Sequence, residues 1–162
     1  MASDVFERLV ELLRGAAARF RVIEHPPEGR SEAISALRGN RPEQAAKAMV
    51  LDLRGGGGGK RHVLAVLPGS RRLDFVAVAR LFEARKCGFA SPQTAQKLTG
   101  CVMGSVPPFS LDPALALVVE QDLLDNETLF FNAGRLDRSM ELDTRDWLKL
   151  AQPKVARIAA AP

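Results

Sequence analysis

The sequence contains few of the side chains that build metal sites and disulfide frameworks. Its 162 residues include two cysteines, Cys87 and Cys101, and two histidines, His25 and His62. Four potential ligands spread this widely lack the paired spacing of a tetrahedral zinc site. Two cysteines are also too few for a disulfide framework. We therefore expect no bound metal and no disulfide.

Long apolar runs are also missing. The longest, 63–68 and 114–119, fall far short of the ~20 residues that a membrane span needs. The N-terminal residues carry an acid, Asp4, where a signal peptide carries basic residues, and no apolar stretch follows. We expect a cytoplasmic protein with no membrane-spanning segment.

The common catalytic signatures do not occur. There is no Gly-x-Ser-x-Gly elbow, no Gly-x-x-x-x-Gly-Lys phosphate loop and no His-Glu-x-x-His helix. The run of five glycines at 55–59 has no phosphate-loop pattern around it and is typical of a variable hairpin tip. We expect no cofactor, and any catalysis must proceed without these devices.

What the chain does contain indicates one globular domain over residues 1–162. Hydrophobic residues make up 46% and charged residues 26%, which are ordinary globular values. The net charge is only +4, but residues 54–97 carry nine basic and two acidic side chains, whereas 110–146 carry three basic and nine acidic. A basic half suits a polyanionic partner. The alternative is a solvated surface on which these charges scatter.

Periodicity and end signals predict the secondary structure. Helices are expected at 4–20, 31–38, 74–85, 91–100 and 144–150, and strands at 21–25, 47–53, 62–67, 115–120, 128–131 and 139–142. Asp4, Ser31 and Ser91 are expected at helix N-termini, and Gly39 and Gly100 are expected to stop helices. Residues 132–134 are typical of a turn. The elements interleave without regular βαβ alternation, which favours an α+β fold with a mixed sheet and peripheral helices.

The segment 100–110 is a loop with unusual hydrogen-bonding capacity. Pro107 and Pro108 have no N–H to donate, which leaves the amides of Gly104, Ser105 and Val106 as free donors. A short stretch of unpaired N–H groups can polarise an ester carbonyl or hold a developing oxyanion. A tight structural turn explains the same residues equally well.

Lys47 is the second candidate for chemistry. It stands at the head of an apolar strand with no acidic neighbour in the sequence. The functional interpretation is a lysine aimed into a cleft beside the 100–110 loop. The alternative is a strand-end lysine that reaches for water.

Four segments together resemble a known family. They are Lys47-Ala-Met-Val-Leu, Phe89-Ala-Ser-Pro, the loop from Gly100 to Phe109 with Gly104-Ser-Val-Pro-Pro108 in it, and Phe131-Asn-Ala-Gly. Over nearly the whole chain they resemble the YbaK/prolyl-tRNA synthetase-associated domain family. Three details are most similar to its YeaK branch, which is related to the ProXp-ST proteins: Thr99-Gly-Cys-Val, Pro107-Pro-Phe-Ser and Phe131-Asn-Ala-Gly.

The resemblance implies a mixed, partly barrel-like sheet surrounded by helices, and a trans-editing deacylase that hydrolyses the ester of mischarged tRNA. It implies that Lys47 is the functional lysine and that Gly104 and Pro108 belong to the family's Gly-x-x-x-Pro loop. Some relatives carry a histidine where this chain has Phe130-Phe131-Asn132, so a histidine-dependent mechanism is not implied. Such an enzyme positions the substrate, a water and the ribose hydroxyl, and polarises the carbonyl. The expected catalytic residues are Lys47, Gly104, Ser105, Val106 and Pro108.

The expected substrate is seryl- or threonyl-tRNA. Small polar residues next to methionines suit a small hydroxylated side chain, and the expected pocket residues are Ser31, Met49, Met103 and Asn132, with Ser105 nearby. If these polar residues are only caps and turn-formers, an apolar pocket selects alanyl or cysteinyl esters instead. The basic residues expected to contact tRNA are Arg71, Arg72, Arg85 and Lys86.

The same residues are compatible with two other functions. A non-catalytic module that binds tRNA or an aminoacyl-tRNA synthetase would keep the basic face. A small-ligand domain that never meets nucleic acid would not need it. The sequence does not specify the oligomeric state.

Overall fold

Five α-helices and eight strands build the chain in the computed structural model, which describes residues 4–162. In chain order they are α1 (Val5–Gly15), β1 (Phe20–Glu24), α2 (Ser31–Arg38), β2 (Ala46–Arg54), β3 (Arg61–Pro68), α3 (Phe75–Leu81), β4 (Lys86–Phe89), α4 (Pro92–Thr99), β5 (Leu115–Glu120), β6 (Thr128–Arg135), β7 (Arg138–Asp143), α5 (Thr144–Ala151) and β8 (Lys154–Ala156). Short 3₁₀ turns occupy Pro42–Gln44 and Gln121–Asp125. Among these residues, no helix is both long and apolar enough to cross a membrane.

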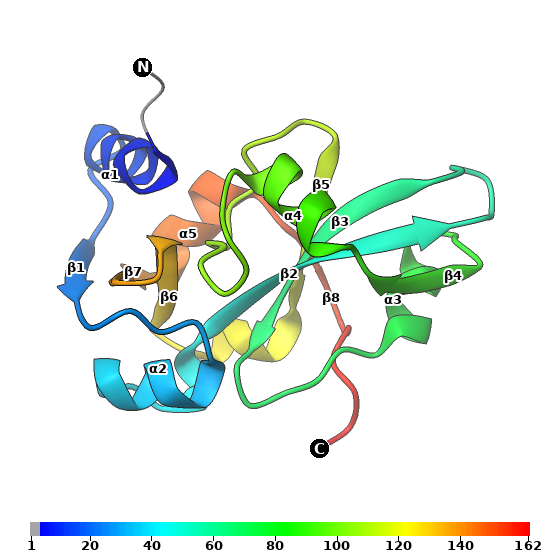
Figure 1. Ribbon diagram of the computed structural model, residues 1–162. Helices are drawn as coiled ribbons and strands as arrows, with labels where there is room; N and C mark the ends of the chain where they lie inside the picture. The colour runs from blue at the N-terminus through cyan, green and yellow to red at the C-terminus, as the bar shows by residue number, and fades with distance from the viewer. Residues whose placement is uncertain (1–3) are drawn as a thin grey trace.

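The strands form two sheets. One is antiparallel, in the order β1-β7-β6, and the other is mixed, in the order β4-β2-β3-β5-β8, with β5 parallel to both β3 and β8. An isolated bridge between Ala45 and Phe130 joins them. Figure 1 shows the long β2–β3 hairpin projecting away from the three-stranded sheet. The α+β fold with a mixed sheet and peripheral helices is confirmed, although the two sheets do not close into a barrel.

Several predicted helix ends are confirmed at atomic detail. The Asp4 carboxylate accepts a hydrogen bond from the Glu7 amide, and Ser91 does the same for Thr94. Gly39 and Gly100 adopt the left-handed conformation that ends α2 and α4. The expected Ser31 N-cap is wrong by one residue: Arg30 holds that position without a side-chain cap.

Strand β6 corrects the predicted turn at 132–134. The strand runs on to Arg135, and its pairing with β7 shifts register between Asn132 and Arg135. Gly134 has φ 86° there, and a Cβ atom on it would lie 3.0 Å from the Val5 side chain of α1. A glycine with positive φ serves a bulge as well as a turn, and here it lets a helix pack closely on the strand.

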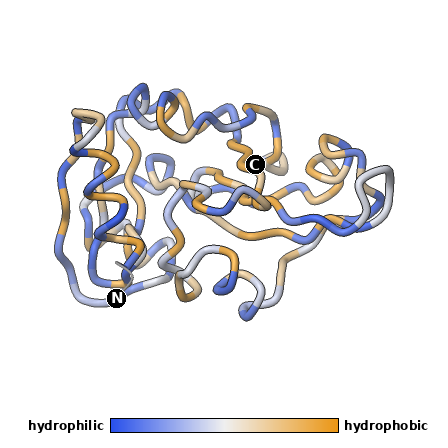
Figure 2. Tube along the Cα trace, turned by 90° about the horizontal axis from the view of Figure 1, so that it is seen from above, coloured by the Kyte–Doolittle hydropathy of each residue, from blue (hydrophilic) through white to orange (hydrophobic). Residues whose placement is uncertain are grey.

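The main hydrophobic core lies between α1, α5 and the three-stranded sheet. Leu9 and Leu13 of α1 pack in it with Phe131, Met140 and Trp147, all of them buried. Figure 2 shows orange, hydrophobic stretches of the chain running through the middle of the molecule. The Trp147 indole N–H donates a 2.9 Å hydrogen bond to the Pro108 carbonyl, so the core also anchors the end of the 101–110 loop.

Glu120 fixes the C-terminal segment to the end of β5. Its carboxylate is 1% exposed and accepts backbone hydrogen bonds from Ile158, Ala159 and Asp122, each 2.9 Å long. The Ala160 amide, directly after Ala159, donates a hydrogen bond to the Arg72 carbonyl. Glu120 therefore holds the segment that supports the loop after β3.

Glu120→Ala should destabilise the protein by about 3 kcal/mol or more, because it removes the acceptor of three backbone amides, and each lost hydrogen bond to a charged group costs ~1.5–3 kcal/mol. Urea unfolding followed by circular dichroism measures the loss. Glu11→Ala, on the exposed face of α1, is the matched control and should change stability by less than about 0.5 kcal/mol. Equal stability of the two variants would contradict the anchoring role of Glu120.

Candidate functional site

A cavity of about 390 Å³ opens between α2, the start of β2, α4 and the loop after α4. In the view of Figure 1, β2 runs between α2 and α4. Seven of the nine residues expected at the catalytic centre or in the substrate pocket line this cavity: Ser31, Lys47, Met49, Met103, Gly104, Val106 and Asn132. Segments far apart in the sequence therefore meet at one site.

Lys47 lies in the cavity wall, half-buried. Its Nζ donates a 3.0 Å hydrogen bond to the Arg71 carbonyl. Burial, and secondarily the positive charge of Arg72, lower the pKa of Lys47. One hydrogen bond leaves two ammonium donors for a ligand. The ammonium therefore lies against the segment after β3, in the wall of the cavity that the loop after α4 also lines.

Arg71 supports this lysine instead of facing solvent. Its guanidinium donates to Asp122 Oδ2 at 2.9 Å and to the Ala160 carbonyl at 2.8 Å, and its side chain is 19% exposed. Arg71 is one of the four expected tRNA contacts, but both of its Nη atoms are engaged within the protein. The other three expected tRNA contacts, Arg72, Arg85 and Lys86, are exposed.

The loop after α4 supplies two free amides instead of three. The Ser105 N–H donates to the Val102 carbonyl at 3.0 Å, and its hydroxyl donates to the same oxygen at 2.8 Å. Within residues 4–162, the amides of Gly104 and Val106 make no hydrogen bond. Ser105 is fully buried and, like Pro108, shapes the loop without lining the cavity. The prediction that the Ser105 amide is free is therefore wrong, because this amide closes a turn with the Val102 carbonyl.

Gly104 is placed where no side chain fits. It has φ 87°, and an added Cβ would lie 2.8 Å from the Gly29 Cα and 3.0 Å from the Gly29 carbonyl oxygen. Contact between two glycines brings the segment before α2 against the loop after α4. The cavity owes its shape to this close approach.

Asn132 ties these segments together with every polar atom of its side chain. Nδ2 donates to the Glu28 carbonyl at 3.0 Å and to the Gly104 carbonyl at 2.6 Å. Oδ1 accepts from Ser139 Oγ at 2.9 Å and from Arg38 Nη1 at 3.4 Å. An amide has two donors and two acceptor sites, so none is left for substrate. Asn132 lines the pocket as expected, but its amide acts as a clamp.

Cys101 is the one thiol in the cavity wall. Burial raises its pKa, and the side chain is 3% exposed. A buried thiol that stays protonated is a poor nucleophile. Residues 4–162 also hold no group of three or more His, Cys, Asp or Glu side chains arranged to bind a metal.

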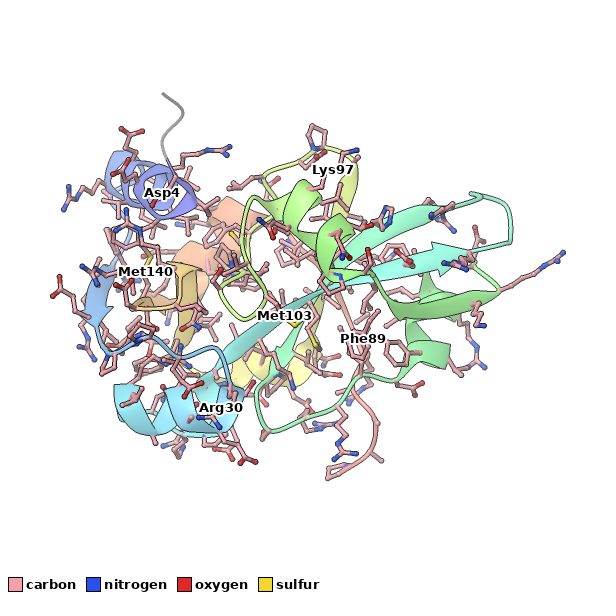
Figure 3. The ribbon with its side chains drawn as sticks, viewed as in Figure 1. Asp4, Arg30, Phe89, Lys97, Met103 and Met140 are labelled. Carbon is pink, nitrogen blue, oxygen red and sulfur yellow. The ribbon has the colours of Figure 1, made fainter. Side chains whose placement is uncertain are left out.

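Two exposed apolar side chains line the cavity, and the sequence did not predict that they would lie at the same site. Phe89 is 62% and Met103 is 72% exposed, and both line the cavity (Figure 3). The Phe89 ring meets Phe75 edge to face, with 5.1 Å between centroids. Sequence reasoning also missed Arg38, which lines the cavity with Ser31 and Ile34. The signal was present in their spacing, since positions 31, 34 and 38 share one helix face.

The fold and sequence match known proteins. Residues 25–150 match the family described as aminoacyl-tRNA editing domain. A protein of Escherichia coli strain K12, named multifunctional Ser/Thr-tRNA deacylase ProXp-y, is 41% identical over 154 residues, which cover 94% of this chain and 92% of that protein.

Solved structures show the same fold at lower identity. A putative trans-editing enzyme for prolyl tRNA synthetase superposes with a TM-score of 0.81 at 23% identity, covering 99% of this chain and 100% of the other. A hypothetical protein gives a TM-score of 0.83 at 23% identity, covering 94% and 99%. Together with the cavity, its half-buried lysine and its two free amides, these matches show that the chain belongs to the aminoacyl-tRNA editing domain family.

Proposed function

We propose that residues 1–162 act as one trans-editing domain that hydrolyses the ester of mischarged aminoacyl-tRNA, with seryl and threonyl esters preferred. The observation that carries the proposal is the pairing of Lys47 with the unpaired amides of Gly104 and Val106 in a single cavity. The named activity of the Escherichia coli relative supports both the reaction and the preference.

The geometry suits hydrolysis without a protein nucleophile. The ester carbonyl accepts hydrogen bonds from the Gly104 and Val106 amides, which stabilise the negative charge that develops on its oxygen. Water attacks the carbonyl carbon, the bond to the ribose oxygen breaks, and the water proton passes to that oxygen. The neighbouring ribose hydroxyl helps to orient the water, and Lys47 places the terminal nucleotide. The products are the free amino acid and uncharged tRNA.

The acceptor end has a suitable entrance. Phe89 and Met103 offer an apolar platform on which the terminal base can stack. Arg72, Arg85 and Lys86 are exposed and can meet backbone phosphates. An aminoacyl-tRNA synthetase is a second candidate partner. A module that only binds would need these cations but not two free amides in a cavity.

The deciding experiment is deacylation of one tRNA charged in turn with serine, threonine, alanine, cysteine or proline, at equal enzyme concentration. Seryl and threonyl esters should be cleaved faster than the other three. Cleavage of none would leave a binding module, and a clear preference for the alanyl ester would move the protein to an alanine-specific activity.

Lys47→Met should lower kcat/KM by about 100-fold while the protein stays folded, because a misplaced substrate costs a factor of that order. The methionine keeps the apolar stem of the side chain and removes the ammonium. Single-turnover deacylation of seryl-tRNA measures the effect. Lys97→Met, an exposed lysine on α4, is the control and should retain full activity. A fully active Lys47→Met protein would remove the lysine from the mechanism.

Gly104→Ala should cut activity by at least about tenfold, because positive φ is unfavourable for alanine and the new methyl group would collide with the Gly29 backbone. The collision has to move the loop that carries both amides. Gly57→Ala is the control, since its Cβ would meet nothing within 4 Å. Normal turnover by Gly104→Ala would mean that the loop is only a structural turn.

Arg72→Ala, Arg85→Ala and Lys86→Ala should each weaken tRNA binding and reduce the slope of log K against log salt by roughly one, as expected for the loss of a phosphate contact. Filter binding or fluorescence anisotropy at several salt concentrations gives the slopes. Arg8→Ala, on exposed α1, should leave the slope unchanged. Unchanged slopes in all three variants would place the tRNA surface elsewhere on the protein.

A further inference from the structure

Arg38 is a buried cation with no anionic partner. It ends α2, is 9% exposed and lines the cavity with Ser31 and Ile34. Burial alone lowers the pKa of Arg38 to about 10, so it remains charged at neutral pH. No carboxylate forms a salt bridge with it among residues 4–162. Buried guanidinium groups usually pair with a carboxylate, since an isolated buried charge is costly.

The donors of Arg38 are only partly used. Nε donates to Asn40 Oδ1 at 3.0 Å, and Nη1 makes two long contacts, 3.4 Å to Asn132 Oδ1 and 3.3 Å to Ser139 Oγ. Nη2 has no hydrogen bond to any group in the described part of the chain. Because Arg38 lines the cavity, Nη2 is the donor that it has left for a bound molecule.

One side chain, Asn132, links Arg38 to the loop of the proposed reaction centre. Its Oδ1 accepts from Arg38 Nη1 at 3.4 Å, its Nδ2 donates to the Gly104 carbonyl at 2.6 Å, and all three residues line the cavity. The substrate group attached directly to an ester carbonyl held at Gly104 is the amino acid itself. In a seryl ester the hydroxyl oxygen is only three bonds from the carbonyl carbon, so the hydroxyl must lie near the loop that holds the carbonyl.

The other polar groups of the cavity are weaker candidates for reading a hydroxyl. The Asn132 amide is fully engaged, and Lys47 is turned toward the Arg71 carbonyl. Ser31 is only half-buried, so water can satisfy its hydroxyl when a ligand does not. A buried, charged donor discriminates more sharply, because a ligand without an acceptor leaves it unpaired.

We propose that Arg38 determines substrate specificity: its Nη2 donates a hydrogen bond to the side-chain hydroxyl of a seryl or threonyl ester. This inference rests on the proposed deacylase function and names the group that sets its preference. Binding of the alanyl ester leaves the guanidinium without this acceptor, so a pocket of this kind rejects the smaller, hydroxyl-free side chain that would otherwise fit.

The test compares kcat/KM for seryl, threonyl and alanyl esters of the same tRNA with wild-type protein and Arg38→Met. The seryl-to-alanyl ratio should fall by about 10- to 100-fold in the variant, the range for loss of a charge-assisted hydrogen bond. Arg41→Met, an exposed arginine just after α2, should keep the wild-type ratio. Thermal unfolding verifies that both variants are folded.

The other outcomes are distinct. If Arg38→Met slows seryl and alanyl esters equally, Arg38 supports Asn132 and Ser139 and the specificity role is wrong. If Ser31→Ala lowers the ratio and Arg38→Met does not, the hydroxyl is read by Ser31. If wild-type protein cleaves none of the esters, the proposed function fails, whatever Arg38 does.

A second measurement needs no variant. Non-hydrolysable amide analogues of seryl- and alanyl-adenosine are titrated into ¹⁵N-labelled wild-type protein, and the arginine side-chain resonances are followed by NMR. The seryl analogue should shift the Arg38 signals well beyond the shift caused by the alanyl analogue. Identical shifts with both analogues would overturn the proposal even if Arg38→Met failed to fold.

Discussion

The side-chain amide of Asn132 holds the site together. Its two N–H groups bind carbonyls of two segments that are far apart in the sequence, at Glu28 and at Gly104. The close contact between Gly29 and Gly104 brings those segments near enough for one amide to reach both. Strand β6 fixes the clamp in turn, because it is packed in the main core. The free amides of Gly104 and Val106 are therefore held in place by a side chain whose strand is packed in the hydrophobic core.

The charge asymmetry along the chain becomes clear once the ion pairs are known. Many acids of the 110–146 segment are used internally: Asp122 pairs with Arg71, Glu141 with Arg21, and Asp143 and Asp146 with Arg19, while Glu120 binds backbone amides. Several basic residues of 54–97 have no ion pair within residues 4–162, among them Arg72, Arg85 and Lys86. Many of the acidic side chains are therefore paired within the protein, whereas several of the basic side chains are left to contact a partner.

Local signals in the sequence were sufficient for most elements and insufficient for part of the site. Ser91, Gly39 and Gly100 mark helix ends through backbone chemistry that neighbouring residues determine, so those ends could be predicted. Gly134 misled, because positive φ is equally compatible with a turn and with a bulge in β6. The consumption of the Ser105 amide and the burial of Arg38 depend on contacts between distant segments, which no local pattern encodes. Strands β4 and β8 are too short to show a period.

The anchoring of the C-terminal segment also affects the order in which the site can form as the chain folds. Lys47 belongs to a hairpin whose two strands are neighbours in the sequence, so pairing them closes only a short loop. The Lys47 ammonium donates to the carbonyl of Arg71, and the Arg71 side chain donates to the Ala160 carbonyl. Glu120 holds Ala160 in place because it binds the amide of the preceding residue, Ala159. Before residues 158–160 have docked, the folding chain has the lysine but not this support. The lysine therefore reaches its working position only after a contact between distant segments has formed.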